Sequence, residues 1–267
     1  MSRKQEHEII IDAPLEAVWK AIVDGEELTR WFVDEASVTP GVGGTVEISW
    51  DGGEKGRNQI DVWEPNQKLR LSKPGPAAAQ GGESALMVLE YTIERRDGKT
   101  VLRLVHSGIP SGPEWDSFYD GTNAGWPSFF RTLRHYLERH PGKPRATIKV
   151  IGKLPVSLEE GWARLTGSGG FGFTPVAGQQ FSTTTSAGDV VQGNVVFVKQ
   201  PGMLEITIDE LDQAYLAHAM AGAGPNQYVY TVLSVYGKSA EEVEAIRAKW
   251  QPWLKSVLGV DAPSVKS

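Results

Sequence analysis

Cysteine is absent from the 267 residues, which excludes disulfides, thiolate nucleophiles and cysteine-ligated metals. No segment approaches the roughly 20 consecutive apolar residues that a membrane-spanning helix needs. The first ten residues, MSRKQEHEII, lack the apolar stretch of a signal peptide. The net charge of −6 argues against a general nucleic-acid-binding protein. We therefore expect a cytoplasmic protein with no membrane span and no nucleic-acid partner.

Charge is distributed unevenly along the chain. Residues 1–142 hold 16 basic and 22 acidic residues, whereas residues 143–267 hold 11 of each. The change falls at a Pro/Gly-rich connector, His140-Pro141-Gly142-Lys143-Pro144, and proline and glycine in this arrangement end a helix. We predict one domain over residues 1–141 and a second over residues 146–260.

The first half begins with an alternating segment in which His7, Ile9 and Ile11 share one face, as in a half-buried strand. Short helices follow, and then a run of alternating segments joined by turn sequences such as Asp97-Gly98. The half ends with a long amphipathic helix after a polar, irregular stretch at residues 112–124. Its apolar stripe is formed by Trp126, Phe129, Phe130, Leu133 and Leu137. The order predicts an α+β domain in which a curved antiparallel sheet wraps around the last helix.

The second half repeats the first in a diverged form. Four segments match in the same order, with an offset that shrinks from 143 to 124 residues, as deletions in loops would cause. They are 15–19 with 158–162, 69–72 with 204–207, 105–108 with 234–237, and 126–133 with 250–257. We therefore predict two tandem domains of one architecture, with Trp19 equivalent to Trp162 and Trp126 to Trp250.

Several motifs of the first half resemble a known family. The segments Ile11-Asp12-Ala13-Pro14, Val18-Trp19, Thr100–Gly108 and Gly125-Trp126 are similar to those of START-like (SRPBCC) helix-grip domains. They most resemble the branch named after activators of the heat-shock-protein-90 ATPase, over residues 6–140. The resemblance implies a helix-grip fold with a cavity between sheet and helix, and relatives that bind hydrophobic small molecules. Because the pattern begins at about residue 6, we do not expect the separate N-terminal domain of true activators.

His106 is the polar side chain of most interest, because strand alternation places it on the face of Leu102 and Leu104, toward the expected cavity. A structural histidine is the alternative interpretation. We also expect aromatic rings to line the cavity, with core packing as their alternative and a lid or contact surface as a further role for Trp115. The predicted ligand-binding residues are Trp31, Phe32, Trp50, Tyr91, His106, Trp115, Trp126, Phe129 and Phe130.

Other motifs predict no chemistry. The GxGxxG match at residues 167–172 follows a predicted helix instead of a strand, so we do not interpret it as a dinucleotide site. The acidic residues Glu114, Asp116 and Asp120 lack the spacing of a calcium loop. The histidines are scattered. We therefore predict no metal site, no cofactor and no assigned catalytic residue.

Three functions remain open. The first is binding of a hydrophobic or amphipathic small molecule in the larger cavity, which we expect in the N-terminal domain. The second is a cyclase- or hydrolase-type enzyme that uses His106 with a carboxylate or Tyr91 in the same cavity. The third is a protein-interaction or stress-response role, which predicts an exposed apolar patch.

Overall fold

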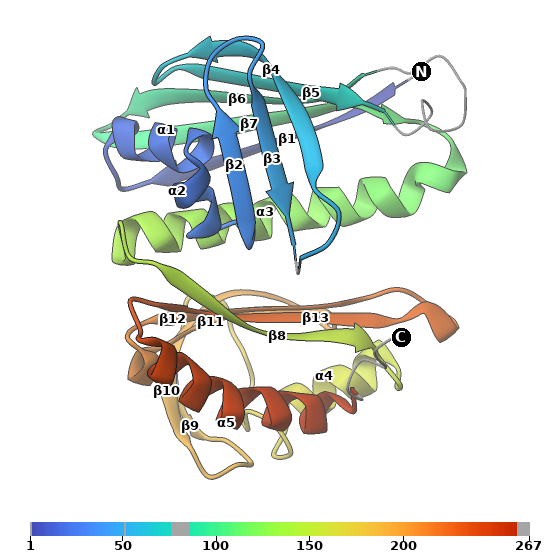
Figure 1. Cartoon of the computed structure of the whole chain (residues 1–267). Helices are drawn as coiled ribbons and strands as arrows, with labels where there is room; N and C mark the ends of the chain where they lie inside the picture. The colour runs from blue at the N-terminus through green and yellow to red at the C-terminus, as the bar shows by residue number, and fades with distance from the viewer. Residues whose placement is uncertain (1, 51, 76–85, 261–267) are drawn as a thin grey trace. The chain divides into compact units, whose positions relative to one another are not determined.

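The computed structural model describes residues 2–50, 52–75 and 86–260, and it divides into two compact units, Met1–Lys143 and Pro144–Ser267 (Figure 1). None of the helices in these ranges is long and apolar enough to cross a membrane. Each unit contains one antiparallel sheet and one long helix that lies along a face of that sheet.

The first unit is a seven-stranded sheet with strand order β1-β7-β6-β5-β4-β3-β2. Its first and last strands are therefore neighbours, and the long helix α3 follows β7 directly. The elements are β1 (Ser2–Ile11), α1 (Leu15–Val23), α2 (Gly25–Thr29), β2 (Glu35–Thr39), β3 (Thr45–Ser49), β4 (Gly56–Glu64), β5 (Lys68–Pro74), β6 (Leu86–Arg96), β7 (Lys99–Pro110) and α3 (Asp116–Arg139).

Local sequence explains much of this arrangement. Asp24 caps α2 by accepting a hydrogen bond from the backbone N–H of Glu27. Asp97 and Gly98 both have positive φ and form the tight β6–β7 turn that the Asp-Gly pair predicts. Trp126, Phe130 and Leu133 are buried on the inner side of α3, as the apolar stripe predicts.

The start of α3 differs from our prediction. We expected an irregular stretch at residues 112–124, but only a short 3₁₀ turn (Pro113–Trp115) precedes the helix, which begins at Asp116. This helical turn is stabilised by β1. Arg3 pairs with Asp116 at 2.6 Å, and its guanidinium lies 4.5 Å from the centre of the Tyr119 ring. A polar sequence without apolar periodicity therefore becomes helical through contacts with a distant strand.

The second unit has the strand order β8-β13-β12-β11-β10-β9, which matches the first unit with one edge strand fewer. Its elements are β8 (Arg145–Lys153), α4 (Leu158–Thr166), β9 (Gln180–Thr184), β10 (Val190–Lys199), β11 (Met203–Ile208), β12 (Ala214–Ala221), β13 (Tyr228–Tyr236) and α5 (Ala240–Leu258). Short 3₁₀ turns lie at Asp209–Leu211 and Gly224–Asn226.

The four repeated segments fall on equivalent elements of the two sheets. They make α1 equivalent to α4, β5 to β11, β7 to β13 and α3 to α5. Ser157 and Ser239 cap the two helices of the second unit, and Ser239 with Glu242 forms a complete capping box. The protein is therefore a tandem pair of α+β helix-grip domains.

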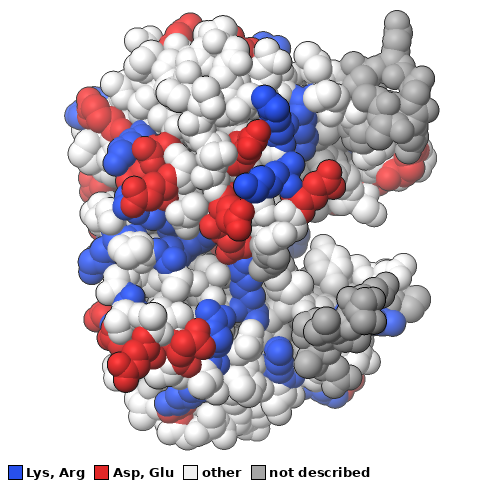
Figure 2. All heavy atoms as spheres, viewed as in Figure 1, with Lys and Arg blue, Asp and Glu red and all other residues white. Residues whose placement is uncertain are grey.

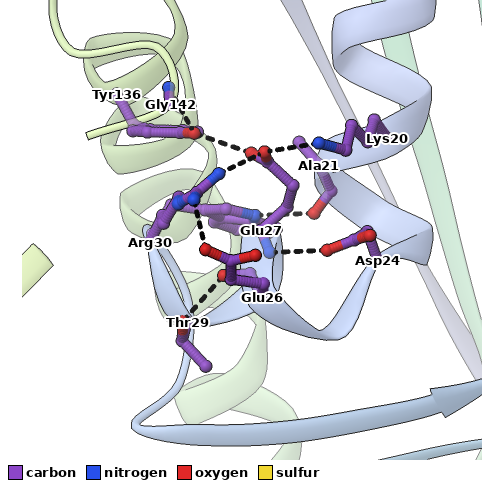
Figure 3. A network of polar contacts seen from close by, with 10 residues as sticks. Lys20, Ala21, Asp24, Glu26, Glu27, Thr29, Arg30, Tyr136 and Gly142 are labelled. Carbon is purple, nitrogen blue, oxygen red and sulfur yellow. Dashed lines mark hydrogen bonds and ion pairs between the residues drawn. The ribbon is translucent and has the colours of Figure 1, made fainter. Parts of the chain in front are cut away.

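A buried polar network holds the end of α3 against the short helices of the first unit (Figure 3). The Glu27 carboxylate on α2 contacts Arg30 at 2.5 Å and Lys20 of α1 at 3.2 Å. The Tyr136 hydroxyl on α3 donates to Glu27 at 2.6 Å and accepts from the Gly142 backbone N–H at 2.9 Å. Burial, and then the hydrogen bond to Glu27, raise the pKa of Tyr136 to about 12. Side chains from three helices thus surround the Glu27 carboxylate, and Tyr136 links it to the Gly142 backbone, where the chain leaves the domain.

Candidate functional site

The inner face of β1 and β7 carries a group of polar side chains beneath α3. Gln5 and His106 are direct cross-strand partners, and His7 is the partner of Leu104 one step along the same face. Gln5 is 3% exposed and His106 is 4% exposed. We call Gln5, His7 and His106 the polar corner of the first domain.

The hydrogen bonds of Gln5 fix which end of its amide faces the helix. Its Nε2 atom lies 2.7 Å from the Tyr119 backbone carbonyl and 3.0 Å from Thr122 Oγ1. A carbonyl oxygen only accepts hydrogen bonds, so the amide nitrogen must face α3. The amide oxygen, Gln5 Oε1, is consequently the free end, and it is buried without a hydrogen-bond partner.

The bond between His106 and Trp126 likewise fixes a tautomer. The indole Nε1–H of Trp126 donates to His106 Nδ1 at 3.2 Å. Because an indole N–H only donates, Nδ1 carries no proton and the neutral ring is protonated at Nε2. Burial first, and then the charges of Lys73 and His7, lower the pKa of His106 to about 4. His106 is therefore a neutral side chain at pH 7 and presents an N–H donor.

His7 completes the corner. Its Nε2 atom is buried without a hydrogen-bond partner, and burial lowers the pKa of its side chain. A buried polar atom without a partner costs about 1–3 kcal/mol. The corner therefore holds two such atoms, Gln5 Oε1 and His7 Nε2, next to the N–H donor of His106.

Aromatic rings surround the corner and cover it. The Trp126 and Phe118 rings of α3 meet the His106 ring edge to face at 6.1 and 6.4 Å, and Trp115 contacts Phe118 at 6.2 Å. Phe118 is 37% exposed. It thus lies between solvent and His106.

A second row of rings extends from Trp126 to the surface. Phe32 stacks on Trp126 at 5.9 Å and meets Phe129 and Trp50 edge to face at 4.9 and 5.3 Å. Trp50 is 39% exposed, and its indole N–H donates to the Phe32 carbonyl at 3.3 Å. The aromatic cluster therefore reaches solvent at two places, Phe118 and Trp50.

The structure places the nine predicted residues in different surroundings. Trp126 and His106 are in direct contact, and Tyr91 is buried beside Trp126 at 6.4 Å. Trp31 is buried and donates to the Ala21 carbonyl of α1 at 2.9 Å, so it also joins α1 to the turn after α2. Phe130 is fully buried against Trp126. The others, Phe32, Trp50, Trp115 and Phe129, lie toward the surface.

Gln5 and His7 were not among the predicted site residues. The alternation of β1 placed His7 on the face of Ile9 and Ile11, and the same period-two pattern extended back to Gln5 would have placed that residue there too. A polar side chain on an otherwise apolar strand face was the available signal.

The larger cavity that we expect in the first domain stays a prediction. In the described part of that domain, the predicted lining residues pack against one another. In the second domain, a shallow surface depression is lined by Thr185, Asp189, Lys249, Trp250 and Trp253. Lys249 pairs with Asp189 across it at 2.5 Å.

The second domain lacks the polar corner. The inner faces of β8 and β13 carry Ile148, Val150, Leu233 and Val235, which all belong to its apolar core. Its own buried polar pair lies on β12 and β13, where His218 Nδ1 and Thr231 Oγ1 are 2.8 Å apart. The two domains share a fold but differ in the chemistry of the sheet face beneath the helix.

The described residues contain no group of three or more metal-ligating side chains. On the face shown in Figure 2, acidic and basic side chains are interspersed over both domains.

A curved antiparallel sheet wrapped around one long helix defines the helix-grip class of proteins. This chain contains that arrangement twice. Residues 12–138 match the family model described as Activator of Hsp90 ATPase homolog 1-like protein. The first domain is therefore similar to this family over most of its length.

Some of the similar solved structures cover about half of this chain, and others cover nearly all of it. Protein MLL2253 from Mesorhizobium loti is 27% identical, with a TM-score of 0.45, over 52% of this chain and 98% of that chain. The di-domain ARO/CYC protein BexL from the BE-7585A biosynthetic pathway is 14% identical, with a TM-score of 0.44, over 97% of this chain and 100% of that chain. No curated protein matches the chain.

Proposed function

We propose that the first domain binds a small, mostly apolar molecule between the inner face of its sheet and α3. The observation that carries the proposal is the polar corner, where Gln5 Oε1 and His7 Nε2 are buried without hydrogen-bond partners. Most buried polar atoms in proteins have a partner, and an exception calls for a reason. A bound molecule that supplies the missing partners is such a reason.

The surroundings of the corner suit this role. Ligand sites are mostly apolar and aromatic, with a few polar groups that orient the ligand. The polar corner has this composition, with Trp126 and Phe118 packed on His106. Both rings contact His106, so a ligand that reaches this side chain from α3 must displace one of them. Phe118 is the side chain best placed to move, because it is partly exposed on the first turn of α3.

The geometry favours binding over acid–base catalysis. An effective general base has a pKa near the working pH. The pKa of His106 is lowered to about 4, and the ring nitrogen that could accept a proton is already bonded to Trp126. Tyr91 is buried and its pKa is raised by that burial, so it is a poor proton donor at neutral pH.

A protein-interaction role is the second candidate. It is favoured by the exposure of Trp50 and Phe118 at the two ends of the aromatic cluster. Exposed aromatic side chains are common anchors in protein interfaces. A partner that uses them would cover the cluster instead of entering it.

Titration of the full chain with a neutral apolar dye, N-phenyl-1-naphthylamine, tests the proposal. We expect saturable binding of one dye per chain. Phe118→Ala should speed binding because it uncovers the corner. Gln5→Met should weaken binding about 2- to 10-fold, which corresponds to one hydrogen bond from the amine N–H of the dye to Gln5 Oε1.

Phe173→Ala is the matched control, because Phe173 is a partly buried ring of the second domain that stacks on Phe181 at 4.3 Å. It should leave dye binding unchanged. Absence of saturable binding, or binding that responds only to the control variant, would contradict the proposal. Dye binding that is insensitive to Gln5→Met but lost in Trp50→Ala would favour an exposed contact surface.

A further inference from the structure

The polar corner has a defined hydrogen-bonding pattern that selects among ligands. Gln5 and His106 lie opposite each other on neighbouring antiparallel strands, where facing Cβ atoms are about 4.5–5.5 Å apart. Gln5 presents an acceptor, because its amide nitrogen is used by Tyr119 and Thr122 of α3. His106 presents a donor, because its Nδ1 is used by Trp126.

We infer that the ligand of the first domain carries a neutral hydroxyl group, which donates to Gln5 Oε1 and accepts from the Nε2–H of His106. The inference rests on the proposed function and adds the chemical class of the ligand. A hydroxyl is the smallest group that both donates and accepts, and it therefore satisfies both sides of this pair.

Charged head groups do not fit the pair. A carboxylate only accepts, so it would leave Gln5 Oε1 without a donor. It would also place a charged carboxylate oxygen against the partially negative amide oxygen of Gln5. An ammonium only donates, so it would face the N–H of His106. Burial of either charge without a counter-ion is costly.

The charged and titratable groups around His106 do not provide a counter-ion inside the corner. Lys73 of β5 and His7 are the groups whose charges act on His106. Lys73 is exposed, whereas His7 has a buried, unpartnered nitrogen and a pKa that burial lowers. A carboxylate that pairs with Lys73 would therefore lie at the solvent-exposed end of β5 instead of in the corner.

The ligand's body is apolar and flat. The groups around the corner are the rings of Trp126 and Phe118, with Tyr91 buried behind Trp126. Aromatic rings favour offset or edge-to-face contacts with another ring. We accordingly expect a hydroxylated aromatic molecule to bind more tightly than a hydroxylated aliphatic one of equal size.

Three probes that share one ring system separate the possibilities: naphthalene, 2-naphthol and 2-naphthoate, each titrated against the full chain at pH 7 by calorimetry. We expect 2-naphthol to bind about 5- to 100-fold more tightly than naphthalene, as two hydrogen bonds imply. We expect 2-naphthoate to bind most weakly.

Two variants test the assigned atoms. Gln5→Met and His106→Phe should each reduce the preference for 2-naphthol over naphthalene by about 2- to 10-fold while naphthalene still binds. Because Gln5 also contacts α3, near-ultraviolet circular dichroism should verify that the Gln5→Met variant is folded. His106→Phe tests the same ligand hydroxyl from the other side of the pair.

The outcomes are distinct. Equal binding of naphthalene and 2-naphthol would overturn the hydroxyl inference and leave the proposed function standing. Tightest binding of 2-naphthoate, lost in Lys73→Met, would overturn it in favour of an anionic ligand. Binding of none of the three probes would overturn the inference together with the proposed function.

Discussion

Removal of a single oxygen atom from Tyr136 should destabilise the first domain. The Tyr136 hydroxyl is fully buried, donates to Glu27 at 2.6 Å and accepts from the Gly142 N–H at 2.9 Å. A hydrogen bond to a charged group contributes about 1.5–3 kcal/mol, and the Gly142 N–H, which lies nearer to solvent, contributes less. We expect Tyr136→Phe to lower the free energy of unfolding of this domain by about 2–3 kcal/mol.

The assay is urea unfolding followed by tryptophan fluorescence, because six of the nine tryptophans lie in the first domain. Two domains need not unfold in one step, so the change should appear in the first-domain transition alone. Tyr119→Phe is the matched control. Its hydroxyl makes one long, exposed bond of 3.3 Å to the Lys4 carbonyl, and its loss should cost less than about 0.5 kcal/mol.

A double-mutant cycle identifies the partner of Tyr136. If the bond to Glu27 carries the effect, Tyr136→Phe and Glu27→Gln should show a coupling energy of about 1–3 kcal/mol. Equal destabilisation by Tyr136→Phe and Tyr119→Phe would refute the reasoning, because the buried carboxylate would then not depend on this hydroxyl.

Three other predictions concern stability and are measured by the same unfolding assay. Phe130→Ala should lower the free energy of unfolding by about 3–5 kcal/mol, because Phe130 is 1% exposed. Phe129→Ala should lower it clearly less, because Phe129 is partly exposed. Equal losses of stability would contradict the packing described above. Burial lowers the pKa of His218 to about 3, so between about pH 4 and 6 the unfolded chain binds a proton that the folded chain does not, and stability falls as the pH falls. His218→Gln should reduce that slope by about 1.4 kcal/mol per pH unit in the second-domain transition, and an unchanged slope would show that His218 is already protonated in the folded protein. Gly108→Ala should destabilise the first domain far more than Gly98→Ala: both glycines have positive φ, but a Cβ at Gly108 would lie 2.0 Å from a backbone oxygen of β6, whereas a Cβ at Gly98 meets nothing within 4 Å.

Much of the fold was predictable because its signals are local. Strand alternation placed His106 on the face of Leu102 and Leu104, and all three are buried on the inner face of β7. The Asp97-Gly98 pair predicted the turn between β6 and β7. The spacing of Trp126 and Phe130 predicted the buried side of α3.

The start of α3 was not predictable, since residues 116–125 are polar and include two glycines and an asparagine. These residues have low or neutral helix propensity. They become helical because Arg3 and Gln5, more than 110 positions earlier, contact Asp116 and Tyr119.

By itself, the sequence determined the α+β class, the tandem duplication and the inward direction of His106, because periodicity, turn residues and internal repeats are properties of neighbouring or aligned positions. Only the tertiary structure decided what the polar residues do. Nothing in the local sequence shows how the amide of Gln5 is bonded. When β1 pairs with β7, the Gln5 amide nitrogen donates to α3, and its amide oxygen is left buried without a hydrogen-bond partner. The proton on His106 is likewise placed by Trp126, which lies 20 positions away and approaches only when the helix packs on the sheet. Hydrogen-bond partners depend on distances between segments remote in sequence, and those distances are fixed by packing.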